Sequence, residues 1–452
     1  MVPENSTQFE RTGSNPVRDI VIGLDFGSSF TKVVLQDPPS KKAFAVPFPR
    51  EGHPRNKFLL PSKLVLDADG TCELGLSDNF ALSHIKRDLM EEPKKYIDLP
   101  VGTETGLKVV VLASIYLALV LRSARRWFLA NLRDEYGRSK IRWHLNVGIP
   151  AKNYDEKNIR VAFLAAARFG WWLSIQEKPL TIQEVTGALQ EPKDRTFLSG
   201  PDYERVQVVP EVAAEVAGYA RSPFRRLGLH MILDIGDSTM DIATFRLQTS
   251  PEQTLTYWFL WAEVSKCACA DLHSRRVDLV TKELKSWLES VKQIVDLHGQ
   301  VPESYDAYSP PSIDLSHVDA AFIKSAAQTV IRTAAISYRN RDPNADEWRE
   351  GVPAFVCGGG CNLSLFRKQF MNNVHHGLRN YFIEKFRMQE LPRPDNLTAD
   401  GLDSSEYHRL AVAYGLSFFY DDIGRIVPPS EIDDIVRVVP VKEVPLIDKD
   451  MV

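Results

Sequence analysis

Residues 19–37 read DIVIGLDFGSSFTKVVLQD, and this stretch predicts the centre of the fold. Two β-branched apolar runs, residues 20–22 and 31–35, flank a Gly-Ser-Ser turn, and such a pattern predicts a β-hairpin. A turn of glycine and serine lets backbone N–H groups approach a phosphate with no large side chain in the way. Asp25 would repel that phosphate unless a divalent cation lay between them, so the stretch indicates Mg²⁺ beside a phosphate. An ordinary tight turn has the same short pattern.

Residues 230–247 read HMILDIGDSTMDIATFRL and repeat the hairpin pattern. When Asp25 and Asp234 are aligned, the preceding leucine, the glycine two residues later and the serine four residues later all match. The β-branched residues Val33 and Ile242 also fall in register. Two such hairpins in register predict two homologous lobes, each with a hairpin that places an acid beside a small-residue turn.

A third pattern lies near the C-terminal end. Residues 353–357 predict a strand, which runs into three glycines at 358–360 and then into a helix over about residues 363–382. A strand, a glycine turn and a helix can place backbone N–H groups and a helix N-terminus against a ligand. A crowded crossover from strand to helix would need the same glycines.

The rest of the chain alternates strands and helices. Gly170 is expected to end one helix, with a new strand over residues 171–175, and residues 38–57 are expected to form a loop. Between residues 254 and 347 the pattern is mostly helical. Further strands are predicted over residues 58–66, 71–76 and 141–149, and a strand followed by a helix over 207–220; helices are predicted over 81–92, 107–132, 154–169, 272–297, 318–338 and 405–419.

The composition excludes several classes of protein. Of 452 residues, 44% are hydrophobic and 25% charged, as in soluble globular proteins, and a formal net charge of −4 offers no basic field for nucleic acid. Five cysteines without a C-x-x-C pattern argue against structural zinc and a disulfide scaffold and favour the cytoplasm. The most apolar run, residues 109–121, is too short to span a bilayer, so we predict a buried helix and no membrane span.

Taken in this order, the patterns resemble the actin-like ATPase superfamily, which includes actin, DnaK-type 70 kDa heat-shock chaperones and sugar kinases. The resemblance covers most of residues 19–425. Residues 25–31 and 233–241 resemble its two phosphate motifs, residues 358–362 its adenosine motif, and residues 210–219 and 409–417 its two connecting helices. Three further matches favour the DnaK branch: Leu60-Pro61-Ser62 before a hairpin, Ile85-Lys86-Arg87, and Val147-Gly148-Ile149-Pro150 before an Ala-rich helix.

This resemblance implies an α/β fold, the actin-like ATPase fold, with two duplicated ribonuclease-H-like lobes around a central nucleotide cleft. The expected organisation is a disordered leader over 1–18, lobe I over 19–225 with a peripheral insertion at about 38–140, lobe II over 226–404 with a helical insertion at about 271–350, a helix over 405–425 that returns to lobe I, and a tail over 426–452. No peptide-binding domain of the DnaK type is expected.

The resemblance also implies ATP and Mg²⁺ as ligands and a role for each motif residue. Asp25 and Asp234 would hold a hydrated Mg²⁺, Glu211 would orient the attacking water, and Lys86 would neutralise charge on the γ-phosphate. Glu211 could instead be an acid stabilised by a helix N-terminus, and Lys86 a solvated lysine; Asp241 is expected to be structural. The residues expected to contact the nucleotide are Gly27, Ser28, Ser29, Thr31, Gly236, Asp237, Ser238, Thr239, Gly358, Gly359, Gly360 and Asn362.

The chain also departs from the DnaK pattern. Asp237-Ser238 replaces a run of glycines, and an acid at that position is closer to actin. Asn362 replaces the arginine that stacks on the base, and residues 263–273 contain no glycine where that family is glycine-rich. Residues 440–448 resemble the interdomain linker of those chaperones, but a short apolar tail that docks on its own lobe or on a partner fits equally.

Two functions follow as expectations. The first is a DnaK-like ATPase-domain protein that binds ATP with Mg²⁺, hydrolyses it slowly to ADP and uses lobe closure as a switch for a protein partner. The alternative is an actin-like cytomotive filament protein whose self-association is driven by ATP. A sugar kinase would need a catalytic base and a sugar pocket that the sequence does not indicate, and a pseudo-enzyme that binds ATP without turnover stays open.

Overall fold

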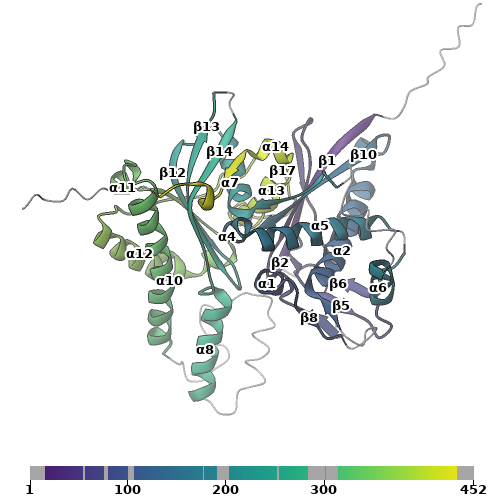
Figure 1. The fold of residues 1–452 in the computed structure, drawn as a ribbon, viewed down its shortest axis with the longest axis horizontal. Helices are drawn as coiled ribbons and strands as arrows, with labels where there is room; N and C mark the ends of the chain where they lie inside the picture. Colours follow the sequence, from purple (N-terminus) through teal and green to yellow (C-terminus); the bar gives the residue numbers. More distant parts are fainter. Residues whose placement is uncertain are drawn as a thin grey trace, which may run out of the picture.

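The computed structural model describes residues 16–434 except 54–55, 76–79, 100–105, 177, 191–202, 252–253, 284–300 and 302–313. Most of the predicted leader, the second half of the predicted helix over 272–297 and the tail from residue 435 lie outside these residues. The described chain is of the mixed α/β class, with two large sheets side by side (Figure 1). Among its helices, none combines the length and the apolar character needed to cross a membrane.

The first sheet is built around the first predicted hairpin. Strands β1 (Val17–Phe26) and β2 (Phe30–Asp37) pair antiparallel, and β10 (Lys140–Ile149) lies parallel to β1 on its other side. The strand order is β11-β10-β1-β2-β3-β17, and β4 also pairs with β2. The other strands of this sheet are β3 (Lys42–Ala45), β4 (Leu60–Pro61), β11 (Val206–Pro210) and β17 (Leu397–Thr398).

The second sheet repeats this arrangement around the second hairpin. Strands β12 (Gly228–Ile235) and β13 (Met240–Thr249) pair antiparallel, and β15 (Pro353–Cys357) lies parallel to β12. The order is β16-β15-β12-β13-β14-β18, so the five strands β11-β10-β1-β2-β3 of the first sheet correspond to β16-β15-β12-β13-β14. The remaining strands are β14 (Leu255–Ser265), β16 (Arg387–Gln389) and β18 (Arg425–Val427). Both predicted hairpins are confirmed, and the likeness extends to the strands around them.

Each sheet is covered by helices on both faces, because alternate residues of its central strands are apolar in both directions. Helices α2 (Val109–Asn131) and α5 (Lys157–Ile175) pack on one face of the first sheet, and α13 (Ala411–Leu416) packs on the other. In the second sheet, α10 (Ser316–Ile336) and α12 (Met371–Leu378) cover one face, and α7 (Glu211–Arg221) covers the other.

Helices α7 and α13 cross between the two sheets, at the centre of the molecule (Figure 1). The crossing is close: a Cβ on Gly415 would lie only 1.7 Å from the backbone oxygen of Ala214. Helix α7 follows a strand of the first sheet yet packs on the second, so these two helices tie the sheets together. The two helices predicted over 210–219 and 409–417 therefore lie packed between the two sheets.

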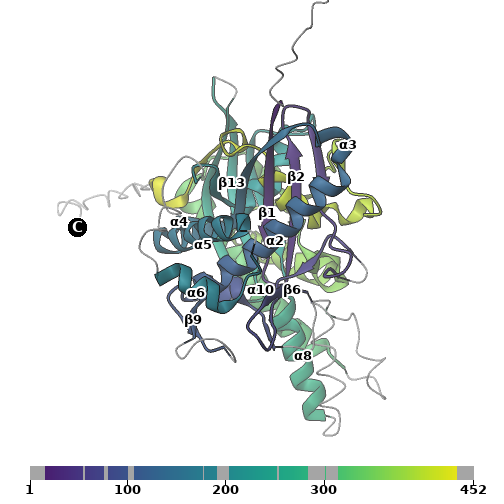
Figure 2. The ribbon, with the colours of Figure 1, turned by 90° about the vertical axis from the view of Figure 1, so that its right-hand side faces the viewer.

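The remaining elements lie around these two sheets and their crossing helices. Helix α8 (Cys269–Glu283) extends away from the body below the second sheet (Figure 2). Two small sheets flank α2 and α1. One has the strand order β6-β5-β7, and the other consists of β8 and β9. Their strands are β5 (Leu64–Leu66), β6 (Cys72–Leu74), β7 (Phe80–Leu82), β8 (Tyr96–Ile97) and β9 (Leu107–Lys108), and the other helices are α1 (Ile85–Glu91), α3 (Arg133–Tyr136), α4 (Ala151–Asp155), α6 (Ile182–Gln190), α11 (Glu347–Glu350) and α14 (Tyr420–Ile423).

Several strands escaped the sequence pattern, among them β14, β3 and β7. Strand β14 lies in the region predicted to be mostly helical, and it is apolar on both faces, so its sequence LTYWFLWAEVS shows little alternation. Its counterpart β3 lies in the predicted loop of residues 38–57, where prolines surround only four strand residues. The helix predicted from residue 81 begins at Ile85, since residues 80–82 pair with β5.

The prediction that Gly170 ends a helix is wrong. Helix α5 continues through Gly170 to Ile175, and the strand predicted over 171–175 does not form. A Cβ on Gly170 would lie 2.8 Å from the backbone oxygen of Ser114 in α2. The glycine therefore permits a close crossing of two helices, which no local pattern reveals.

Gly170→Ala should destabilise the protein by roughly 1–3 kcal/mol, the usual cost of overpacking a core contact. Gly187→Ala is the matched control, because Gly187 lies in α6 and a Cβ there would meet no atom within 4 Å. That control should gain about 0.5–1 kcal/mol from the better helix propensity of alanine. Urea unfolding of both variants measures the difference, and equal shifts would contradict the packing role.

The chain changes sheets twice near its end. Strand β17 pairs with β3 of the first sheet, and β18 pairs with β14 of the second. The return to the first sheet therefore begins at residues 397–398, before the predicted boundary at 404, and the chain rejoins the second sheet at residue 425. Helix α13 lies between these two strands.

Candidate functional site

A cavity lies where the β1–β2 turn, the β12–β13 turn and the loop after β15 meet. Thirteen of the predicted site residues line it, although they come from segments far apart in the sequence. These are Asp25, Gly27, Ser28, Ser29, Lys86, Glu211, Asp234, Gly236, Asp237, Thr239, Gly358, Gly359 and Gly360; the other lining residues are Phe30, Lys32, Glu215, Asp241, Cys269, His408, Arg409 and Val412.

The two hairpins bring their aspartates to the cavity with different cross-strand neighbours. Asp25 lies opposite Lys32 in the β1–β2 ladder, and Lys32 Nζ donates to Asp25 Oδ2 at 2.8 Å. Asp234 lies opposite Asp241 at the same position of the β12–β13 ladder. One hairpin thus presents an ion pair, whereas the other presents two acids side by side. Burial first, and then the neighbouring charge of Glu211, raises the pKa of Asp241 well above its ordinary value.

Lys86 and Glu211 meet as a buried ion pair. Lys86 Nζ donates to Glu211 Oε1 at 2.7 Å, and each side chain is only 6% exposed. Lys86 lies in the first turn of α1, two residues after the N-cap His84, whose backbone is left-handed (φ 63°). Burial raises the pKa of Glu211 to about 7 against the opposing effect of Lys86. Lys86 is therefore not a solvated helix lysine.

Acidic side chains outnumber basic ones around the cavity. Six acids, Asp25, Glu211, Glu215, Asp234, Asp237 and Asp241, face three bases, Lys32, Lys86 and Arg409. Buried carboxyl oxygens of Glu215 (Oε2) and Asp241 (Oδ1) have no hydrogen-bond partner. Hard carboxylate oxygens in excess suit a cation such as Mg²⁺. Within the described part of the chain, no group of three His, Cys, Asp or Glu side chains is arranged to hold a metal ion directly.

Protein atoms leave no room for a Cβ at Gly358 or Gly360, and a Cβ at Gly359 would be tight. A Cβ on Gly358 would lie 2.2 Å from Asp234 Oδ1, and one on Gly360 would lie 2.6 Å from Cys269 Sγ. A Cβ on Gly359 would lie 3.2 Å from Arg409 Nη2. This turn is the crowded crossover that the sequence left as the alternative, and the crowding side chains themselves line the cavity.

Three predicted residues do not line the cavity. Thr31 is fully buried and its hydroxyl contacts that of Ser62, which donates to the backbone oxygen of Gly27 at 2.7 Å. Thr31 thus supports the turn from behind. Ser238 and Asn362 also lie outside the cavity lining, and Asn362 belongs to the rim.

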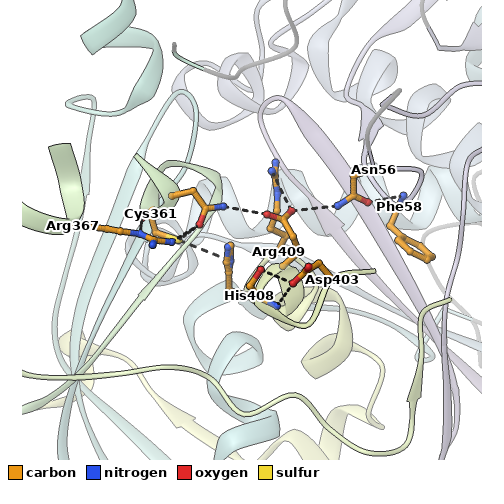
Figure 3. Close-up of polar contacts among 10 residues, drawn as sticks. Asn56, Phe58, Cys361, Arg367, Asp403, His408 and Arg409 are labelled. Carbon is orange, nitrogen blue, oxygen red and sulfur yellow. Dashed lines mark hydrogen bonds and ion pairs between the residues drawn. The ribbon is translucent and has the colours of Figure 1, made fainter. Parts of the chain in front are cut away.

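A polar network lies at that rim, and Figure 3 shows it between Arg367, Arg409 and Asn56. Its centre is Glu406 of the 3₁₀ segment Ser404–Arg409. Asn362 Nδ2 donates to Glu406 Oε1 at 3.2 Å, and Asn56 Nδ2 donates to Glu406 Oε2 at 3.5 Å. Arg409 pairs with the same carboxylate at 3.8 Å. Asn56 precedes β4 of the first sheet and Asn362 follows β15 of the second, so the network joins both sides. Deeper in, Ser29 Oγ donates to Asp237 Oδ2 and connects the two hairpin turns.

Sequence reasoning missed Lys32, Glu215 and Arg409 as cavity residues. Lys32 and Asp241 both follow their aligned aspartate by seven residues, so the repeat itself could have identified this pair. Glu215 lies one helical turn after Glu211, on the same face of α7. Arg409 begins the predicted connecting helix over 409–417, but nothing in that pattern marks it as a cavity residue.

The buried acids predict an unusual pH dependence. Burial, followed by the charge of Asp234, raises the pKa of Glu215 well above 4.5. The folded chain therefore holds a proton that the unfolded chain releases, so stability falls as the pH rises above 4.5 towards the raised pKa. Glu215→Gln should remove this contribution and stabilise the protein by about 1–3 kcal/mol at about pH 8, the cost of one unsatisfied buried group.

Urea unfolding at about pH 5.5 and about pH 8 measures this effect. The Gln variant should gain at the higher pH and gain little at the lower. Equal gains at both values would contradict the protonated state of Glu215.

Comparison with known proteins gives no assignment: no protein-family model matches the chain, and no curated protein matches its sequence.

Proposed function

We propose that the chain has an actin-like ATPase fold with two ribonuclease-H-like lobes, closest to the nucleotide-binding domain of DnaK-type chaperones, and that it binds ATP with Mg²⁺ in the central cavity. The observation that carries the proposal is the meeting of two hairpins of the same pattern, each with an acid at its turn, at one cavity closed by a glycine turn. The matching strand orders and the two crossing helices support the fold. Residues 19–225 and 226–404 would be its two lobes.

The lining residues divide into roles in this proposal. Asp25 and Asp234 would hold the water shell of Mg²⁺, which when bound screens the phosphates from the acidic lining. Backbone N–H groups of the two turns would donate hydrogen bonds to phosphate oxygens. Lys86, now paired with Glu211, would turn to the γ-phosphate and leave Glu211 free to orient a water. Because the pKa of Glu211 is about 7, this carboxyl group can accept a proton near neutral pH.

The closed rim supports a switch. The contacts Ser29–Asp237 and Asn56–Glu406–Asn362 join the two sides of the cavity, so entry of a nucleotide must separate or rearrange them. A nucleotide that changes the spacing of the two sheets could be recognised by a protein partner, and slow hydrolysis to ADP would reset the state.

Calorimetric titration of the full chain with ATP, in Mg²⁺ and in EDTA, tests the proposal. We expect saturable binding with Mg²⁺ and much weaker binding in EDTA, because the lining carries more acids than bases. Absence of binding under both conditions would refute the function. A pull-down from cell extract in ATP and in ADP then tests for a nucleotide-dependent partner.

The alternative is a filament protein driven by ATP, and Asp237 at the tip of the second hairpin favours it as the actin-like feature of the sequence. Centrifugation of the purified chain with ATP or ADP separates the two functions. ATP-dependent pelleting would support the filament, and a chain that stays in the supernatant in both nucleotides would support the switch.

A further inference from the structure

Arg409 differs from the other two bases of the cavity. Lys32 and Lys86 are held in direct contacts of 2.8 and 2.7 Å with Asp25 and Glu211. Arg409 pairs with Glu406 only at 3.8 Å, beyond hydrogen-bond distance, although its side chain is just 11% exposed. A largely enclosed guanidinium whose one ion pair among the described residues is long keeps donor capacity for another anion.

The surroundings aim this guanidinium at the cavity. Its Nη2 atom lies against Gly359, where a side chain would intrude on it, and Arg409 lines the cavity together with both hairpin turns. Asp234 lines the same cavity, and burial outweighs the neighbouring acids and lowers the pKa of Arg409. Glu406, its partner, lies on the rim and is shared with Asn56 and Asn362 (Figure 3).

We propose that Arg409 binds a phosphate group of the nucleotide and that Glu406 holds the guanidinium until the nucleotide arrives. The inference rests on the proposed function and adds a phosphate-binding residue that no sequence motif marks. When Arg409 turns to a phosphate oxygen, its contact with Glu406 is lost, and the rim contacts of Glu406 with Asn56 and Asn362 are free to rearrange. Arg409 and Glu406 compete as partners in this scheme: phosphate and carboxylate are alternative anions for one cation.

Binding of adenosine, ADP and ATP to the full chain in Mg²⁺ tests this role. Arg409→Ala should weaken ADP and ATP binding by roughly 10- to 100-fold, the value of a hydrogen bond to a charged group, and leave adenosine binding within about twofold. Arg409→Lys should recover part of the loss, because lysine keeps the charge but not the planar donors. Arg367→Ala is the matched control: it removes a guanidinium of the same rim network that does not line the cavity, and it should leave ADP binding within about twofold.

Glu406→Gln provides a second measurement that leaves Arg409 intact. Removal of the competing carboxylate should tighten ADP binding by about 2- to 10-fold. This variant decides the question if the Arg409 variants fail to fold.

The outcomes separate this inference from the proposed function. Equal losses for adenosine and ADP, or no loss for either, would overturn a phosphate contact while ATP binding by the wild type stands. Unchanged or weaker ADP binding by Glu406→Gln would overturn the competition. A wild-type chain that binds neither ADP nor ATP would overturn the proposed function itself.

Discussion

Asp234→Asn should strongly weaken Mg²⁺-dependent nucleotide binding and at the same time stabilise the nucleotide-free protein. Asp234 lies opposite Asp241 in the β12–β13 ladder and lines the same cavity as Asp25. Burial, and then the charge of Asp25 against the opposing effect of Lys32, keeps the pKa of Asp234 raised. A buried acid beside other acids lowers the stability of the protein when no ligand is bound. Such an arrangement is typical of functional sites, where a bound cation offsets the destabilisation.

We expect affinity for ATP in Mg²⁺ to fall by roughly 100-fold, because the neutral amide no longer orders the water shell of the cation. The free energy of unfolding without nucleotide should rise by about 1 kcal/mol, since the neutral amide carries no charge for burial and the neighbouring Asp25 to oppose. Calorimetry and urea unfolding measure the two effects. Asp400→Asn, an exposed aspartate outside the cavity lining, is the control and should change neither.

A variant that loses stability as well as binding would indicate a structural aspartate instead. The same substitution at Asp25 should also lower the affinity, but its stability should fall, because Lys32 loses its partner. The opposite stability changes of the two variants follow directly from the different cross-strand neighbours. If both variants bind ATP as the wild type does, the site is assigned wrongly.

Lys86→Met should destabilise the protein by about 3–5 kcal/mol near neutral pH, because it leaves the Glu211 carboxylate buried without its counter-charge. Both partners are only 6% exposed and their contact of 2.7 Å joins α1 to α7. The loss should shrink as the pH falls to about 5.5, because burial raises the pKa of Glu211, and in the variant Lys86 no longer opposes that rise, so the carboxyl group takes up a proton. Urea unfolding at the two pH values measures it.

A surface pair with the same contact distance is the control. Lys266 and Glu91 also meet at 2.7 Å, but their side chains are 83% and 47% exposed, so Lys266→Met should cost less than about 1 kcal/mol. The double variant Lys86→Met with Glu211→Gln should recover most of the lost stability, because no unpaired charge stays buried. It should not recover ATP hydrolysis. Equal costs for Lys86→Met and Lys266→Met would contradict the buried pair.

Local patterns predicted the hairpins, the long helices and most of the cavity lining. The aspartates and turn residues were found because a strand, an acid and a small-residue turn are neighbours in the chain. The repeat then showed that the pattern was more than one ordinary turn. Lys32 and Asp241 occupy the same position of the repeat, because each follows its aspartate by the same number of residues. This correspondence was missed as evidence that both residues line the cavity.

Errors arose where distant segments decide the structure. Gly170 resembles a helix end, but the helix continues because α2 passes close to that residue. Strand β14 lacks the alternation of a half-buried strand because helices cover both of its faces. The glycines at 358–360 are explained by Asp234, Arg409 and Cys269, which approach them from other parts of the chain.

The sequence by itself determined the local elements and the chemistry at the turns, because periodicity and turn sterics depend on neighbours in the chain. Only the tertiary structure decided which charges meet: Lys32 with Asp25, Lys86 with Glu211, and Arg409 with Glu406. It also decided that Glu215 and Asp241 are buried with unpartnered oxygens. The physical reason is that burial and electrostatic pairing depend on distances in space, which arise only when the two sheets and the crossing helices α7 and α13 come together.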